Sequence, residues 1–190
     1  MLCEYILDCH AFQNEVGEET NGYYYTDFND APYGTYACNY EYSYLRHFLN
    51  NEFYNTAFSE EEKEKILLST VKNDYESANK EPSNLYSSAD TNDCVFVPSI
   101  KEITNKHYGF SPEAKIDSLR TQVRTDYALI CGAHDQNNGM TTWWLRSFYL
   151  SVGKFSQVVY SVAKDGKILT FDYVYSTSIG IVPMLKTSSN

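Results

Sequence analysis

The chain has 190 residues, 43% hydrophobic and 21% charged, which is typical of a globular domain with a sizeable core and excludes a disordered polyelectrolyte. Its formal net charge is −10 at pH 7, and the sequence contains no Lys/Arg-rich run. Nucleic acid and anionic membrane surfaces are therefore disfavoured as partners, because both are negatively charged. We expect no signal peptide or transmembrane segment, because the N-terminus lacks a basic region and no apolar run reaches about 18 residues. The sequence leaves the compartment open.

Cysteine and histidine are too scattered to indicate a metal centre. Five cysteines, with no C-x-x-C pair, predict mostly buried, reduced thiols. They are Cys3, Cys9, Cys38, Cys94 and Cys131. Four histidines show no H-x-x-x-H spacing, and no Gly-rich phosphate or dinucleotide motif is present. The sequence therefore predicts no metal and no cofactor.

The first part of the chain predicts a strand, a loop and a helix. Cys3–Cys9 is a short apolar strand candidate, and residues 10–39 are rich in Asn, Gly, Pro and Asp, which favours a structured loop. Apolar residues then recur at i, i+3, i+4 and i+8 within residues 42–58, as on one face of a helix. They are Leu45, Phe48, Leu49 and Phe53.

Further helices are marked by capping signals, in which a polar side chain satisfies the free amides of the first turn. The signals are Ser59 with Glu62, Ser99 with Glu102 ahead of a helix that Gly109 ends, and Thr125 ahead of a helix that Gly132 ends. Residues 67–73 are expected to turn into a strand, and residues 73–93 to form a long surface loop. Cys94–Ser99 is expected to be a short buried strand.

Strands dominate the C-terminal part. Two alternating runs, residues 156–163 and 167–174, flank Asp165-Gly166, which is a strong hairpin signal. Gly180–Leu185 is the last strand, and its Pro183 suggests an edge or a bulge. The expected fold class is α+β, a single domain over residues 1–190 with short N-terminal and central helices and a C-terminal antiparallel sheet with a hairpin.

Several sequence blocks occur in one order: "YLRHFLNNEFYNTAFSEEEKEKI", "DCVFVPSIKEI", "RTDYA", "WWLRS" and "GIVPML". Over roughly residues 3–186 the chain thereby resembles a bacterial family of domains of unknown function (family 6273), which implies no activity. The family usually carries an arginine where Val182 stands, Ser-Pro-Gly-like residues where Phe148 and Tyr149 stand, and a strand pair before Cys3–Cys9. The resemblance therefore implies that N-terminal strands are missing here.

A looser likeness links the helices, paired tryptophans and C-terminal hairpin to the C-type-lectin-like and formylglycine-generating-enzyme-like folds. The formylglycine enzymes use two late cysteines, and none follows Cys131 here. Calcium lectins use a Glu-Pro-Asn-type loop with Trp-Asn-Asp, which Glu81–Ser83 matches poorly. Neither activity is therefore expected.

The "WWLRS" block is interpreted as a structural framework. Trp143 and Trp144 are expected in the core, and Arg146 in a buried strand then needs a carboxylate. Asp126 is the predicted partner, and Arg146→Ala is predicted to abolish folding. A binding role for this arginine remains the alternative.

Aromatic residues make up 16% of the chain, including 18 tyrosines. Tyrosine suits recognition because it is amphipathic and loses little entropy when fixed. Phe148, Tyr149, Tyr173 and Tyr175 lie in or beside expected loops and strand ends, where recognition residues usually occur. We therefore expect a non-catalytic domain that binds a protein or a glycan through this C-terminal face.

Two alternatives stay open. One is an enzyme of unknown reaction, which would use Cys131 with His134 or an acidic cleft. The other is a structural accessory module of a larger surface protein. Because the binding interpretation is preferred, no catalytic residue is predicted.

Overall fold

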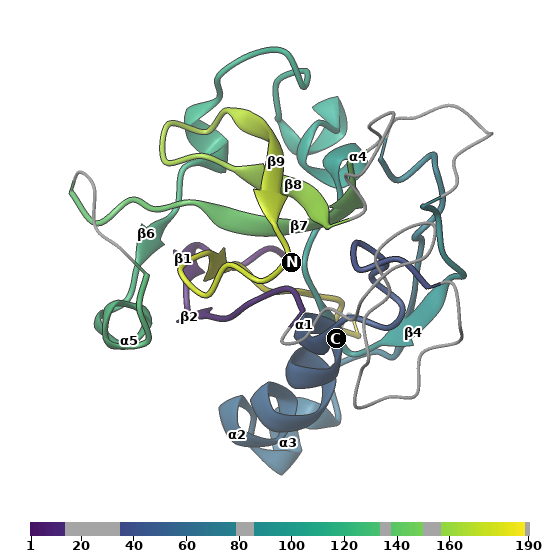
Figure 1. Cartoon of the computed structure of the whole chain (residues 1–190). Helices are drawn as coiled ribbons and strands as arrows, with labels where there is room; N and C mark the ends of the chain where they lie inside the picture. The colour runs from purple at the N-terminus through teal and green to yellow at the C-terminus, as the bar shows by residue number, and fades with distance from the viewer. Residues whose placement is uncertain (14–34, 79–85, 134–137, 150–156, 189–190) are drawn as a thin grey trace.

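A five-stranded sheet forms the centre of the computed structural model, with strand order β2-β10-β7-β8-β9 (Figure 1). The pair β10–β7 is parallel, and the other three pairs are antiparallel. The structure describes residues 1–13, 35–78, 86–133, 138–149 and 157–188. The strand bounds are β2 Asp8–Cys9, β10 Gly180–Ile181, β7 Trp143–Phe148, β8 Val158–Val162 and β9 Ile168–Tyr173. The mixed α+β class and the C-terminal antiparallel sheet are confirmed.

The β8–β9 hairpin forms where the Asp165-Gly166 signal predicts it. Gly166 has φ +79°, a left-handed conformation that glycine adopts without steric cost. A Cβ atom at this position would lie 1.9 Å from the carbonyl oxygen of Asp117. The turn therefore requires glycine both for its backbone conformation and for its close approach to the segment before β6.

Among the described residues, three two-stranded sheets accompany the central one. Their strands are β1 Tyr5–Ile6 with β6 Val123–Arg124, β5 Val95–Phe96 with β11 Met184–Leu185, and β3 Ser69–Val71 with β4 Thr91–Asp93. Each of the two predicted strands Cys3–Cys9 and Gly180–Leu185 is divided into two, and the pieces join different sheets. The prediction of a loop over residues 73–93 is wrong at β4, because Thr91–Asp93 pairs with β3, some 20 residues earlier in the chain. Most of the predicted loop 10–39, and all of Glu81–Ser83, lie outside the described residues.

The helices are short, and several begin where the capping signals predict. Both capping boxes are present, at Ser59 and Ser99, and Thr125 caps the last helix. The predicted helix 42–58 is one α–π–α segment, with the π-helix in its middle. The bounds are α1 Tyr44–Phe48, η1 Leu49–Phe53, α2 Tyr54–Ala57, α3 Glu60–Lys63, α4 Ile100–Ile103, η2 Lys106–Tyr108, η3 Ser118–Arg120 and α5 Asp126–Ile130.

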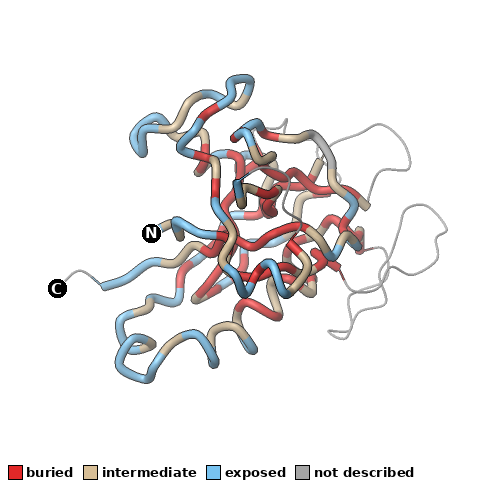
Figure 2. The backbone as a smooth tube through the Cα atoms, turned by 90° about the vertical axis from the view of Figure 1, so that its left-hand side faces the viewer, coloured by how far each residue is buried: buried red, intermediate tan, exposed pale blue. Residues whose placement is uncertain are grey.

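The two adjacent tryptophans pack in different hydrophobic clusters of the core. Side chains alternate along a strand, so Trp144 belongs to a cluster with Phe12, Leu45 and Phe96, whereas Trp143 belongs to another with Ile6 and the buried residues of α4. Both indoles are fully buried. Their Nε1 atoms donate to backbone carbonyls, from Trp143 to Arg120 at 3.1 Å and from Trp144 to His10 at 2.8 Å. This central position agrees with a framework role for the pair, and Figure 2 shows the buried segments running through the middle of the molecule.

A second arginine, Arg120, is fully buried, and no feature of the sequence indicated it. Its guanidinium donates to the carbonyl oxygens of Gly166, Ile103, Ser111 and Lys115. Arg120 therefore ties the hairpin turn, α4 and the segment before η3 together.

Candidate functional site

The tyrosine turn, which we define as residues 173–178, carries the most exposed part of the predicted aromatic face. Tyr173 is 46% and Tyr175 is 50% exposed. Their rings are stacked, with centroids 5.2 Å apart and planes inclined by 18°. Two of the four predicted binding residues therefore lie side by side on the surface, at the end of β9, which is an edge strand of the central sheet.

The backbone between the two tyrosines is firmly anchored. Val174 is fully buried, its amide donates to the carbonyl of Gln157 at 2.9 Å, and its carbonyl accepts from the amide of Gln13 at 2.8 Å. The amide of Ser176 donates to the carbonyl of Tyr173 at 2.9 Å and closes a turn. Tyr173 and Tyr175 are exposed and Val174 between them is buried, as expected for side chains that alternate along a strand. Both rings are therefore held by a backbone segment that is anchored by hydrogen bonds.

Asp172 precedes the tyrosine turn on β9. Its carboxylate accepts a hydrogen bond from the hydroxyl of Ser161 on the neighbouring β8. Burial raises the pKa of Asp172 above its ordinary value, although the Ser161 hydrogen bond opposes that change. This carboxyl group therefore connects the neighbouring strands β8 and β9.

Phe148 and Tyr149 differ from the other two predicted binding residues. Phe148 is only 3% exposed and packs in the same core cluster as Trp144, so the prediction that it lies on a recognition surface is wrong. Tyr149 is half-buried, and its ring packs edge-to-face on Tyr160 at a centroid distance of 5.4 Å. Every residue of β7 is buried, because both faces of the strand are covered. The segment that follows, residues 150–156, lies outside the described residues.

Arg146 pairs with Glu102 of α4, and the predicted partner Asp126 is wrong. Its Nη1 lies 2.6 Å from Glu102 Oε2 and its Nη2 lies 3.1 Å from Glu102 Oε1, so the pair is bidentate. Arg146 also donates to the carbonyls of Lys72 and Val97. Asp126 is exposed in the first turn of α5. The capping-box spacing indicated that Glu102 begins a helix, but nothing local indicated that this helix faces β7.

Burial alone would raise the pKa of Glu102. The charge of Arg146 and the hydrogen bonds from Arg146 and Ser99 outweigh burial and hold the pKa of Glu102 below its ordinary value. The guanidinium itself is nearly enclosed, with 2% side-chain exposure, and the Glu102 side chain is 28% exposed. Four hydrogen bonds engage the Arg146 donors inside the protein, which supports a structural role for this arginine.

Within the part of the chain that the structure describes, Cys131 does not show the surroundings of an activated nucleophile. Burial and a hydrogen bond to Asp8 raise the pKa of its thiol above the ordinary value, so thiolate is scarce at neutral pH. The nearby Cys9 thiol is affected more strongly, and burial raises its pKa to about 12. His134, the proposed base, lies outside the described residues. Among the described residues, the groups that interact with the Cys131 thiol include Asp8, Tyr127 and Cys9.

All five cysteines are free thiols, of which Cys9 and Cys38 are buried. Within the residues that the structure describes, no group of three or more His, Cys, Asp or Glu side chains is arranged to hold a metal ion. None of the described helices is long and apolar enough to pass through a bilayer.

A family model described as Domain of unknown function (DUF6273) matches residues 15–187, and the chain belongs to this family. The family description assigns no activity, so the match establishes the family of the domain and indicates no reaction. Neither a curated protein nor a solved structure gives a match. The likeness to C-type-lectin-like folds stays a prediction.

Proposed function

We propose that this domain is a non-catalytic binding module that recognises a glycan through Tyr173 and Tyr175. The observation that carries the proposal is the stacked, half-exposed tyrosine pair on a backbone anchored through Val174. Pyranose rings present apolar C–H faces, which pack favourably on the electron-rich faces of aromatic rings. A platform that is already fixed loses little entropy when a ligand binds, so a small contact can still give measurable affinity.

Two further features favour a glycan. The tyrosine turn continues with Ser176, Thr177 and Ser178, whose short polar side chains are suited to sugar hydroxyl groups, and the Ser176 and Ser178 hydroxyl oxygens lie 3.4 Å apart. The net charge of −10 disfavours acidic ligands at long range, so a neutral glycan is the preferred class. The fold-level likeness to lectins is compatible with this proposal and adds no evidence about the site.

The test is a glycan array followed by isothermal titration with the best neutral oligosaccharide. Tyr173→Ala and Tyr175→Ala are each expected to weaken binding by roughly twofold to tenfold, because an aromatic contact contributes about 0.5–1.5 kcal/mol. Tyr5→Ala is the matched control, since Tyr5 is 52% exposed and lies on β1, outside the tyrosine turn. Equal affinity of both turn variants and the wild type, or an array without any bound glycan, contradicts the proposal.

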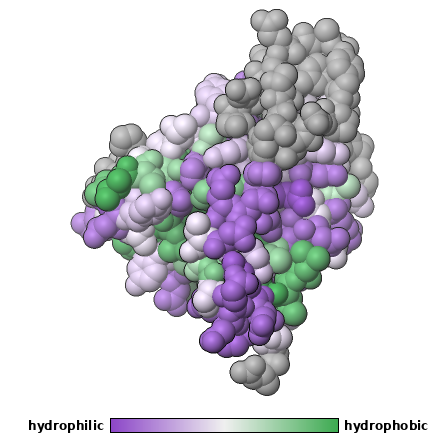
Figure 3. Space-filling view, turned by 90° about the horizontal axis from the view of Figure 1, so that it is seen from below, coloured by the Kyte–Doolittle hydropathy of each residue, from purple (hydrophilic) through white to green (hydrophobic). Residues whose placement is uncertain are grey.

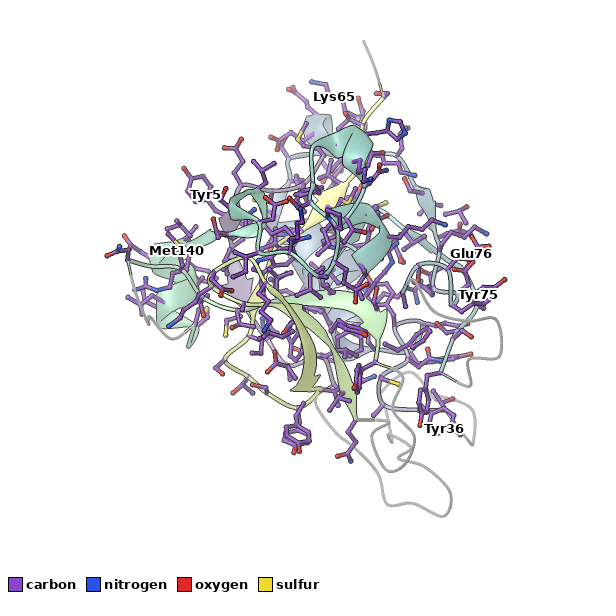
Figure 4. All side chains as sticks on the ribbon, turned by 90° about the horizontal axis from the view of Figure 1, so that it is seen from above. Tyr5, Tyr36, Lys65, Tyr75, Glu76 and Met140 are labelled. Carbon is purple, nitrogen blue, oxygen red and sulfur yellow. The ribbon has the colours of Figure 1, made fainter. Side chains whose placement is uncertain are left out.

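A second candidate function, a structural accessory module, is favoured by a separate exposed apolar surface. We call it the α5 patch, comprising Tyr5, Val123, Tyr127, Leu129 and Ile130. Ile130 is 82% exposed, and only Ala128 of helix α5 is buried. Figure 3 shows hydrophobic residues at the left-hand side of the molecule, where Figure 1 shows α5. Figure 4 shows Tyr5 and Met140 on that same side.

Exposed apolar clusters of this kind often mark protein contacts. A photo-reactive residue at position 130 is expected to cross-link one discrete protein in the native cells. The same residue at position 167, which is exposed in the β8–β9 turn, is the control. Cross-linking that is equal at both positions, or absent at position 130, contradicts an accessory role for the α5 patch.

A further inference from the structure

A cavity of about 580 Å³ opens beside helix α4, away from the tyrosine turn. Its apolar walls are formed by Leu2, Ile103, Tyr108, Phe110 and Met184. We call it the Tyr108 pocket. Its volume falls in the range of about 300–1,000 Å³ that is usual for small-molecule sites, and such sites are mostly apolar with a few polar groups.

The walls come from three separate parts of the chain and are held in place. Ile103 is nearly fully buried at the end of α4. Met184 of β11 pairs with Phe96 of β5 and forms a bridge with Leu2. Gly109, with φ +88°, ends η2 and turns the chain between Tyr108 and Phe110. The cavity is therefore bounded by paired strands and a capped helix, which favours a site that exists before any ligand binds.

Tyr108 is the exposed aromatic residue of this lining, at 65%. An aromatic ring left in water beside an apolar cavity can bury its free face against a ligand, and each square ångström of apolar surface removed from water contributes favourably. The ring is thus available to a ligand, whereas the buried Ile103 forms part of the wall.

Two charged side chains line the pocket, and they are not equivalent. Glu102 is neutralised by its bidentate contact with Arg146, and its Oε2 also accepts from the amide and the hydroxyl of Ser99. Lys186 is exposed, and among the described residues its ammonium has no ion-pair partner. The uncompensated side-chain charge at the cavity is therefore positive, although the whole chain carries −10.

We propose that the Tyr108 pocket binds a small amphipathic carboxylate, a molecule with one apolar aliphatic or aromatic body whose head group pairs with Lys186. The apolar body lies against Tyr108, Phe110 and Met184, and the carboxylate stays at the rim, where the lysine remains hydrated. A second copy of this chain is disfavoured as the occupant, because two chains of net charge −10 repel each other. This site is independent of the proposed glycan face.

The first experiment compares octanoate, octanol and octylamine below their micelle concentrations, with the chain labelled at its methionine methyl groups. The chain supplies both reporters, because Met184 lines the pocket and Met140 forms a bridge with Val123 of β6, outside the pocket. Octanoate is expected to shift the Met184 methyl signal with saturation and to leave Met140 unchanged. Octanol is expected to bind more weakly than octanoate, and octylamine most weakly.

The second experiment uses matched variants. Lys186→Glu is expected to weaken octanoate binding about fivefold to tenfold and to improve octylamine binding, since a charge is reversed at an exposed site. Lys167→Glu makes the same charge change in the β8–β9 turn and is expected to have no effect. Tyr108→Ala is expected to weaken all three ligands, whereas Tyr127→Ala, a variant of similar exposure on α5, leaves them unchanged.

The proposal is overturned by the absence of a saturable shift at Met184, by octylamine binding more tightly than octanoate to the wild type, or by equal effects of Lys186→Glu and Lys167→Glu. Tyr173→Ala is expected to keep full octanoate affinity, so this proposal and the glycan proposal can fail separately. Saturable Met184 shifts by octanol equal to those by octanoate would show an apolar site without head-group recognition and would likewise reject the carboxylate assignment.

Discussion

Replacing Glu102 by Gln isolates the charge of the Arg146–Glu102 pair. Glutamine keeps the shape and can still serve in the capping box at Ser99, but Arg146 then lies 2% exposed without a counter-charge. Removing one partner of a buried ion pair costs about 3–5 kcal/mol. Because the Glu102 side chain is 28% exposed, water offsets part of this loss, and we expect about 2 kcal/mol. For a chain of this size that lowers Tm by about 4–8 °C.

The matched control is Glu62→Gln in the other capping box, at Ser59. That carboxylate has the same hydrogen bonds to its cap, but its helix is largely exposed, and it forms no ion pair with an arginine of the described residues. Urea unfolding of the two variants, followed by tryptophan fluorescence, measures the difference in the free energy of unfolding. Equal stability of both variants and the wild type would refute the reasoning, because the ion pair would then contribute nothing.

The Glu102→Gln variant also tests how the stability of the chain depends on pH in acid. The pKa of Glu102 is lower in the folded chain than its ordinary value of about 4.3, so the unfolded chain binds more protons in the interval between the two. Its contribution to stability is therefore complete above about pH 4.3 and is lost as the pH falls through the folded pKa. The Tm difference between wild type and Glu102→Gln should shrink below that pH. A difference that stays constant down to acid unfolding argues against the ion pair as its source.

Three further substitutions or reagents test the packing. Gly166→Ala is expected to lower the free energy of unfolding, measured in urea, by about 3 kcal/mol, because the new Cβ would lie 1.9 Å from the Asp117 carbonyl oxygen and φ is +79°. A variant as stable as the wild type would show that the turn does not require glycine. Asn50→Ala is expected to lower the free energy of unfolding by about 2 kcal/mol, since the Asn50 side-chain amide makes four hydrogen bonds to backbone groups of α1, β5 and the residue before β5. An unchanged Tm would contradict this prediction. Iodoacetamide should label Cys131 well before Cys38, which is fully buried; the opposite order, read by mass spectrometry of the two peptides, would disprove this difference in burial.

Much of the local structure is predictable from short stretches of sequence. The capping boxes at Ser59 and Ser99 and the glycine in the β8–β9 turn appear where the residues indicate, because the physical causes lie within a few positions of each other. The division of Cys3–Cys9 and Gly180–Leu185 was not predictable. Each is one apolar run in the sequence, and only the position of distant partner strands decides where one pairing ends and another begins.

The candidate site follows the same division. The sequence alone predicted a tyrosine-rich C-terminal face, a buried arginine that needs a carboxylate partner, and the α+β elements in the right order. The tertiary structure decided that Tyr173 and Tyr175 are exposed and Phe148 is buried, because both faces of β7 are covered and alternation along the strand no longer separates core from surface. It also decided that Glu102 and not Asp126 meets Arg146, since contacts between residues far apart in the chain depend on how the elements pack.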